Sequence, residues 1–98
     1  MSFQIITEAG TAKSDAMEAL YAAKDGNYDL AKEKMKSANE TIGKASHAHF
    51  EVIQKEAQGE QLEFKVLFLH AEDQLLTTQT LILLVEELIA VHKKIDSK

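Results

Sequence analysis

The chain contains no cysteine, no proline and no tryptophan, and only four of its 98 residues are glycine. Without cysteine there is neither a disulfide framework nor a thiolate nucleophile, and a reducing compartment is compatible with the sequence. Without proline, and with so little glycine, long helices meet few breakers. Aromatic residues make up only 6% of the chain, and alanine, leucine, lysine, glutamate and glutamine dominate. This composition predicts an all-α protein.

The chain also has no excess of positive charge and no long apolar run. Its formal net charge is −5, so nucleic-acid phosphates would be repelled and a basic partner would suit it better. Residues 1–8 lack the basic and apolar regions of a signal peptide. The longest wholly apolar run, residues 81–85, is far shorter than the roughly 20 residues that span a bilayer. We therefore expect a cytoplasmic protein of one domain, residues 1–98.

Apolar spacing divides the chain into three amphipathic segments. Small and apolar residues recur at steps of three and four, which predicts helices over about residues 2–25, 28–56 and 60–95. In the first turn, Gly26 suits the left-handed position after a helix and Asn27 suits the cap of the next. Gly59 marks the second turn. Gly43 falls inside the second helix, where we expect close packing and no break. Two short turns predict an antiparallel, up-down-up three-helix bundle.

The third segment is apolar on more sides than such a bundle can bury. One side carries Val66, Leu69, Leu76, Leu83 and Ala90. Another carries Phe64, Leu67, Ala71, Leu75, Ile82, Val85 and Ile89. Since monomers rarely expose large apolar patches, the surplus side predicts a homo-oligomer with closed symmetry about an axis close to this helix.

The stretch from His70 to Thr78 carries the chemically distinctive residues. His70 and Asp73 lie three apart and so share one helix face, with Thr77 one turn beyond. Their apolar neighbours suggest a helix buried on most sides, where a charge needs a pairing partner or a metal. Spacing alone leaves open a second interpretation, a solvated helix edge that happens to carry a histidine and an aspartate.

The other histidines have weaker claims to a function. His47 and His49 are two residues apart, so they point to different faces and cannot chelate one ion together. His49 lies on the apolar seam of its helix and is expected to be a core or edge histidine, with a place near His70 of a neighbouring subunit as the alternative. His92 is expected to favour the helix dipole at the end of the chain. For Thr77 and Thr78, hydrogen bonding back along the helix is the expected role.

The segments Glu8-Ala9-Gly10, Asp25-Gly26-Asn27-Tyr28, Glu56-Ala57-Gln58-Gly59-Glu60 and His70-Ala71-Glu72-Asp73 carry a family resemblance over nearly the whole chain. The sequence resembles the enzyme IIA component of the lactose/cellobiose/chitobiose branch of the bacterial sugar phosphotransferase system. The resemblance implies a homotrimer of three-helix bundles. It also implies that His70 is phosphorylated and that three copies of Asp73 hold one Mg²⁺ at the trimer axis.

The partners are likewise implied by the resemblance. His70 would take a phosphoryl group from HPr and pass it to a cysteine of the cognate enzyme IIB, during uptake of a β-linked disaccharide through the IIC permease. The permease would be the only link to a membrane. Chemistry agrees, because a neutral imidazole is a good nucleophile toward a phosphoryl group, and carboxylates are the hard ligands that Mg²⁺ prefers.

The sequence departs from the family pattern beside His70. The usual His-Ala-Gln-Asp is His-Ala-Glu-Asp here, which adds the negative charge of Glu72, and Gln74 and Leu76 stand where His and Met are common. Gln74 puts in doubt any role for a second imidazole at the site. Two other functions remain alternatives: a histidine phosphotransfer module of a two-component pathway, and a structural oligomerisation bundle without chemistry.

Overall fold

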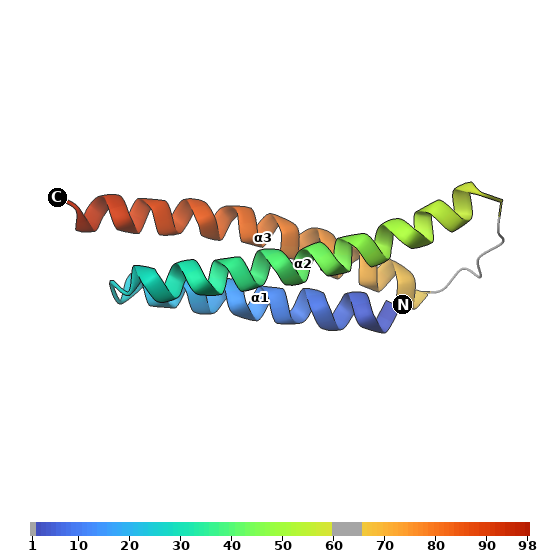
Figure 1. Ribbon diagram of the computed structural model, residues 1–98, viewed down its shortest axis with the longest axis horizontal. Helices are drawn as coiled ribbons and strands as arrows, with labels where there is room; N and C mark the ends of the chain where they lie inside the picture. Colours follow the sequence, from blue (N-terminus) through green and yellow to red (C-terminus); the bar gives the residue numbers. More distant parts are fainter. Residues whose placement is uncertain (1, 60–65) are drawn as a thin grey trace.

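The computed structural model describes residues 2–59 and 66–98 and contains three α-helices in these segments. The helices are α1 (Ser2–Lys24), α2 (Tyr28–Ala57) and α3 (Val66–Asp96). They form a rod of 57 × 19 × 17 Å, in which α2 runs back along α1 and α3 runs parallel to α1 (Figure 1). The all-α prediction is confirmed, and the expected start of the third helix at residue 60 lies outside the described residues.

The turns between helices use the residues that the sequence indicated. Gly26 has φ 81°, the left-handed conformation that glycine adopts without steric cost. The side chain of Asn27 then accepts a hydrogen bond of 3.2 Å from the backbone N–H of Leu30 and caps α2. Gly59, with φ 88°, follows the end of α2. These local choices reverse the chain so that α2 packs against α1.

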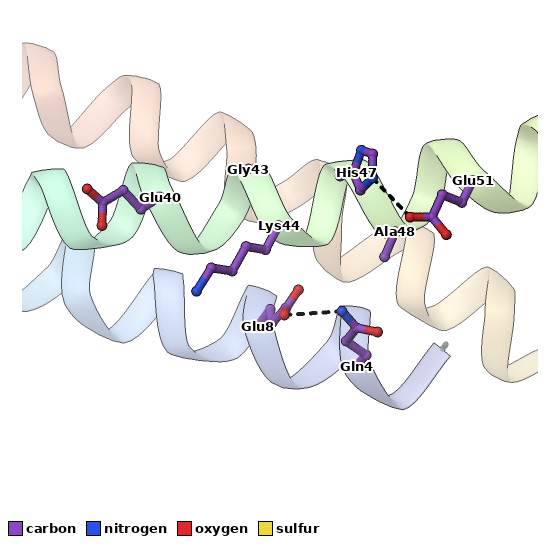
Figure 2. Close-up of a pocket in the computed structure, with 8 residues that line it drawn as sticks. All are labelled: Gln4, Glu8, Glu40, Gly43, Lys44, His47, Ala48 and Glu51. Carbon is purple, nitrogen blue, oxygen red and sulfur yellow. Dashed lines mark hydrogen bonds and ion pairs between the residues drawn. The ribbon is translucent and has the colours of Figure 1, made fainter.

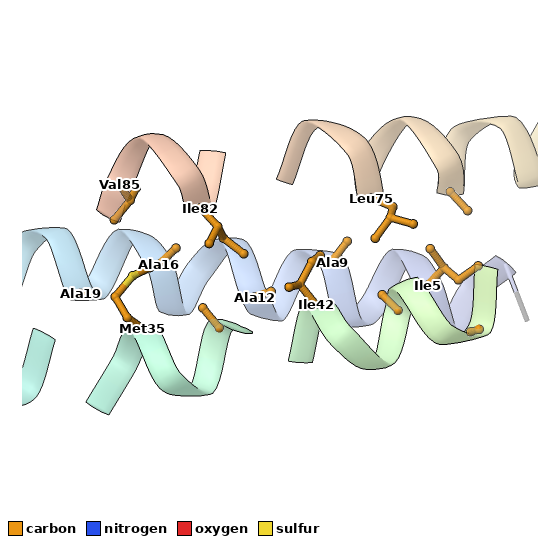
Figure 3. Close-up of a cluster of buried hydrophobic side chains, with 14 residues drawn as sticks. Ile5, Ala9, Ala12, Ala16, Ala19, Met35, Ile42, Leu75, Ile82 and Val85 are labelled. Carbon is orange, nitrogen blue, oxygen red and sulfur yellow. The ribbon is translucent and has the colours of Figure 1, made fainter. Parts of the chain in front are cut away.

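The core is built on a stripe of alanines in α1. Ala9, Ala12, Ala16 and Ala19 are fully buried, and their small side chains allow both other helices to pack closely along α1. Larger side chains fill the remaining space (Figure 3); they are Ile5, Met35, Ile42, Leu75, Ile82 and Val85. The α2–α3 contact is the smallest of the three helix pairings. The bundle is therefore organised around α1.

The prediction for Gly43 is half wrong. Helix α2 continues through it, as expected. However, Gly43 is exposed and a Cβ placed on it would meet nothing within 4 Å. The close approach between helices is made by the alanines of α1, so this glycine serves no packing purpose in the chain.

Helix α3 has two apolar faces, and the bundle covers one of them. The inward face, Ala71, Leu75, Thr78, Ile82 and Val85, is buried. The outward face consists of Val66, Leu69, Asp73, Leu76, Thr80, Leu83, Glu87 and Ala90, all of which are exposed. Apart from Phe64, which lies outside the described residues, the two apolar sides predicted from the sequence are thus distinct in the structure, and only one is used within the chain.

The apolar outward face bears on the expectation that no segment of the chain is apolar enough to span a membrane. By length and composition α3 is apolar enough to cross a membrane, with a mean hydropathy of 1.5 over its most apolar window, of which 22% is buried. The prediction from the longest uninterrupted apolar run missed this, because a few charged residues interrupt the run without changing the average. A helix that buries one apolar face in its own bundle and a second in an interface between chains also reaches such a high mean hydropathy without crossing a membrane.

Candidate functional site

His70 lies in the second turn of α3 and is exposed, whereas the next residue, Ala71, is fully buried. The buried neighbour fixes the helix, and the imidazole projects from a rigid position at the rim of the outward face. The expectation that His70 and Asp73 lie where the helix is buried on most sides is wrong for the single chain. Their apolar neighbours, including Leu69 and Leu76, belong to the outward face, which the other helices leave uncovered.

Asp73 lies in the middle of the outward face, one helical turn from both Leu69 and Leu76. Its carboxylate makes no hydrogen bond or ion pair with any residue of the two described segments. The Thr77 hydroxyl donates to the backbone carbonyl of Asp73 over 2.8 Å, which confirms the expected bonding back along the helix for Thr77, whereas the Thr78 hydroxyl makes no such bond to a described residue. Within residues 2–59 and 66–98, no three metal-ligating side chains gather at one point. One chain therefore offers a single hard oxygen ligand here.

Glu72, between these two residues in the sequence, contacts α2. Its Oε2 lies 2.8 Å from Nε2 of His49, and both side chains are partly exposed, His49 by 23% and Glu72 by 30%. The His49 ring stacks on Phe68 of α3, with centroids 5.7 Å apart and planes 7° from parallel. The prediction of an edge histidine is confirmed, but sequence reasoning missed its pairing with Glu72. The two residues are 23 positions apart, so no local spacing could indicate the contact.

His47 belongs to a separate surface hollow between α1 and α2. Its Nε2 lies 2.9 Å from Glu51, one turn along the same helix. The hollow has a volume of about 450 Å³ and includes Glu8 and Lys44 on its walls (Figure 2). Oxygen Oε2 of Glu8 is buried and has no hydrogen-bond partner within the described part of the chain. No α3 residue lines this hollow, so it does not include His70.

The opposite end of the rod is tied together by Tyr28, whose hydroxyl donates a hydrogen bond to the carboxylate of Asp96 at the end of α3. That hydrogen bond, with smaller contributions from burial and from the negative charge of Asp96, raises the pKa of Tyr28 to about 12. Nζ of Lys93 lies 6.0 Å from the centre of the Tyr28 ring. These contacts fasten the end of α3 that lies far from His70.

Sequence comparison places the chain close to one protein family. The family described as "PTS system, Lactose/Cellobiose specific IIA subunit" matches residues 1–93. The lichenan-specific phosphotransferase enzyme IIA component of Bacillus subtilis is 42% identical over 96 residues, which are 98% of this chain and 87% of that protein.

Solved structures give the same result. The crystal structure of the cellobiose-specific enzyme IIA from Bacillus anthracis superimposes with a TM-score of 0.96 at 44% identity, covering 99% of this chain and 89% of that one. A solution structure of the IIA(Chitobiose)–HPr complex, from the N,N'-diacetylchitobiose branch of the Escherichia coli phosphotransferase system, gives a TM-score of 0.85 at 27% identity. It covers 97% of this chain and 92% of that one.

Proposed function

This chain belongs to the lactose/cellobiose-specific IIA family of the sugar phosphotransferase system, and we propose that His70 is the residue on which it carries a phosphoryl group. The observation that supports this most is the exposed imidazole on a helix whose next residue is fully buried. A rigid, accessible nucleophile is what transfer between two proteins requires, because placement supplies much of the rate. The family assignment favours this function over a two-component module or an inert bundle.

The reaction consists of two phosphoryl transfers. A ring nitrogen of His70 attacks the phosphorus held by the phosphohistidine of HPr, so that one N–P bond forms while the other breaks. In the second transfer, a cysteine thiolate of the cognate enzyme IIB attacks the same phosphorus, an S–P bond forms, and the His70 imidazole leaves. HPr is favoured as the donor because a relative of the same fold has been solved as a complex with HPr.

The outward face of α3 favours a homotrimer. Val66, Asp73, Thr80 and Glu87 are spaced by seven residues, and so are Leu69, Leu76, Leu83 and Ala90. Two such rows form the seam of a coiled coil. The chain also exposes 6605 Å², more than the roughly 5600 Å² expected of a compact monomer of its mass. Three copies of α3 around one axis would cover this seam.

In such a trimer the three Asp73 carboxylates would converge on the axis. Three negative charges brought together at the axis repel one another unless a cation lies between them, and carboxylate oxygens are ligands that Mg²⁺ prefers. The side chain fits this role, since it is exposed among leucines and has no partner within the described residues. One Mg²⁺ per trimer would hold the subunits together. His70 itself is the phosphoryl acceptor and needs no ion for that role.

Membership of the family supports the physiological setting that we propose. The chain serves uptake of a β-linked disaccharide or a related sugar, acts in the cytoplasm, and reaches the membrane only through enzyme IIB and the IIC permease. The names of its relatives include lichenan, lactose and cellobiose.

Incubation of the purified chain with phosphoenolpyruvate, enzyme I and HPr tests the function. We expect intact-protein mass spectrometry to show one added phosphoryl group per chain, which His70→Ala abolishes. His47→Ala is the matched control, because His47 is also exposed but lies on α2, and it should leave the mass gain unchanged. Full labelling of His70→Ala would refute the assignment.

A further inference from the structure

The hollow between α1 and α2 has no part in the function described so far. Its volume of about 450 Å³ lies within the range of roughly 300–1,000 Å³ that is typical of small-molecule sites. No α3 residue lines it, so contacts between copies of α3 do not occupy it. The hollow is therefore a surface feature separate from both the outward face and His70.

A glycine keeps part of this hollow open. Gly43 lies on the α2 wall, and a Cβ placed on it would meet nothing within 4 Å. Glycine is the least favourable residue inside a helix apart from proline, and α2 continues through this position without gaining any packing from it. The bare backbone at Gly43 instead leaves space on the wall of the hollow, one helical turn from Ala48, which also lines it.

The lining of the hollow carries more negative than positive charge. Its three carboxylates belong to Glu8, Glu40 and Glu51. Its one ammonium is that of Lys44, which makes no ion pair with a described residue. One positive and three negative charges give a net charge of −2 when His47 is neutral. The hollow therefore attracts a cation more strongly than its own lysine satisfies.

The side chain of Glu8 has an unused hydrogen-bonding atom. Oε1 accepts a hydrogen bond of 3.3 Å from the Gln4 amide, whereas Oε2 is buried and has no partner within residues 2–59 and 66–98. A buried carboxylate oxygen without a donor is unfavourable. Because the last torsion of a glutamate side chain turns easily, Oε2 can turn toward the hollow and accept a hydrogen bond from a ligand there.

The spacing of the carboxylates selects the kind of cation. In the two described segments no three metal-ligating side chains gather at one point, so these carboxylates do not form the ligand set of a metal ion. Glu40 and Glu51 are eleven residues apart on α2, which separates them by about 16 Å along the helix. Glu8 of α1 lies between them (Figure 2). Such a row suits a long, flexible molecule that carries several charged N–H groups.

We propose that the hollow between α1 and α2 binds a linear polyamine, a methylene chain that carries several ammonium groups. One ammonium donates a hydrogen bond to Oε2 of Glu8, and its neighbours along the chain pair with Glu40 and Glu51 toward the two ends of the hollow. The methylene segments lie along the small residues Gly43 and Ala48. Binding is non-covalent and takes no part in the phosphoryl transfer.

The first test compares two glutamates of α1. Isothermal titration calorimetry of the full chain with spermidine at low ionic strength should show one site per chain. Glu8→Gln removes the charge but keeps the size of the side chain, and should weaken binding about tenfold or more, the loss expected for a charge-assisted hydrogen bond. Glu18→Gln is the matched control, because Glu18 pairs with Lys34 at 2.8 Å and does not line the hollow. It should change the Kd by less than about twofold.

The second test fills the hollow. Gly43→Leu places a large side chain on its wall and should abolish spermidine binding. Its helix content and melting temperature should stay the same or rise, because leucine favours a helix more than glycine does. Gly10→Leu is the matched control, since Gly10 lies inside α1, meets nothing within 4 Å and does not line the hollow. That variant should bind spermidine as the unmodified chain does.

A third measurement tests the class of ligand. Putrescine, a shorter chain with two ammonium groups, should bind more weakly than spermidine because it reaches fewer of the carboxylates. A trilysine peptide that binds more tightly than spermidine would assign the hollow to a basic protein segment and overturn the polyamine.

Three further results would overturn the proposal. The first is the absence of spermidine binding to the unmodified chain. The second is equal weakening by Glu8→Gln and Glu18→Gln, which would show only a general attraction between an acidic protein and a cation. The third is unchanged binding to Gly43→Leu, which would place the spermidine site elsewhere on the chain.

Discussion

The inward and outward faces of α3 are both largely apolar, yet they have different environments in the chain. The inward face packs on the alanine stripe of α1, and Leu75 at its centre is 2% exposed. The outward face has Leu76, the next residue, at 58% exposure. Adjacent leucines of one helix therefore differ in role: Leu75 belongs to the fold of the chain, and Leu76 is available for the proposed contacts between chains.

The polar residues divide in the same way. The buried inward side includes a single polar residue, Thr78, among its described members. The outward face places Asp73, Thr80 and Glu87 at successive seven-residue intervals. Polar groups at such seam positions lower the stability of an assembly while fixing its register and subunit number. The outward face thus has the composition of an interface that must form in one arrangement.

The largest expected effect is the difference in stability between an alanine substitution at Leu75 and one at Leu76. Leu75→Ala leaves a cavity in the core and should lower the free energy of unfolding by about 2–5 kcal/mol at every protein concentration. Leu76→Ala should leave the single chain nearly unchanged and weaken only the assembly, so its effect should depend on protein concentration. Urea unfolding followed by circular dichroism at several concentrations measures both. Equal, concentration-independent losses would contradict the division into two faces.

A second prediction tests the proposed metal site at Asp73. If three carboxylates share an ion, a chelator should destabilise the unmodified assembly. The stability with chelator should be about 2.7 kcal/mol lower than the stability with free Mg²⁺ at a hundred times its Kd. Asp73→Leu should melt at the same temperature with and without chelator, because leucine neither repels its copies nor binds the ion. Glu87→Leu is the matched control on the same face and should retain the metal dependence. Unchanged metal content in Asp73→Leu would refute the site.

Features set by neighbouring residues could be predicted from the sequence. The three-helix architecture follows from apolar spacing, and the reversal at Gly26 and Asn27 follows from the conformations that these two residues prefer. Even the two faces of α3 were separable, because a helix places residues three and four apart on one side. The family, and with it the function class, followed from short segments that surround His70 and the two turns.

Features set by distant residues could not be predicted in this way. The contact of His49 with Glu72 depends on how far α2 and α3 slide past each other, which packing over the whole rod decides. The exposure of His70 differs from the prediction because apolar neighbours in the sequence indicate burial only when they face the bundle, and several of these face away from it. Gly43 was misjudged because its small size matters only when another helix lies opposite. The trimer and its ion stay predictions.

The smallest expected effect concerns Tyr28, which joins the end of α3 to the start of α2. The hydrogen bond to Asp96 raises the pKa of Tyr28 from 10.0 to about 12. A group whose pKa is raised by folding stabilises the fold fully below its unfolded-state pKa and loses that contribution as the pH rises through the folded-state value. Tyr28→Phe should therefore lower the melting temperature slightly and uniformly up to about pH 10, and the difference from the unmodified chain should shrink above that pH and vanish only above about pH 12. Tyr21→Phe controls for the loss of an exposed tyrosine hydroxyl.

The contact between Tyr28 and Asp96 fastens α3 at the end far from His70. Phosphorylation of Tyr28→Phe at neutral pH should therefore proceed at the unmodified rate, and a large loss of rate would show that the two ends of the rod are coupled.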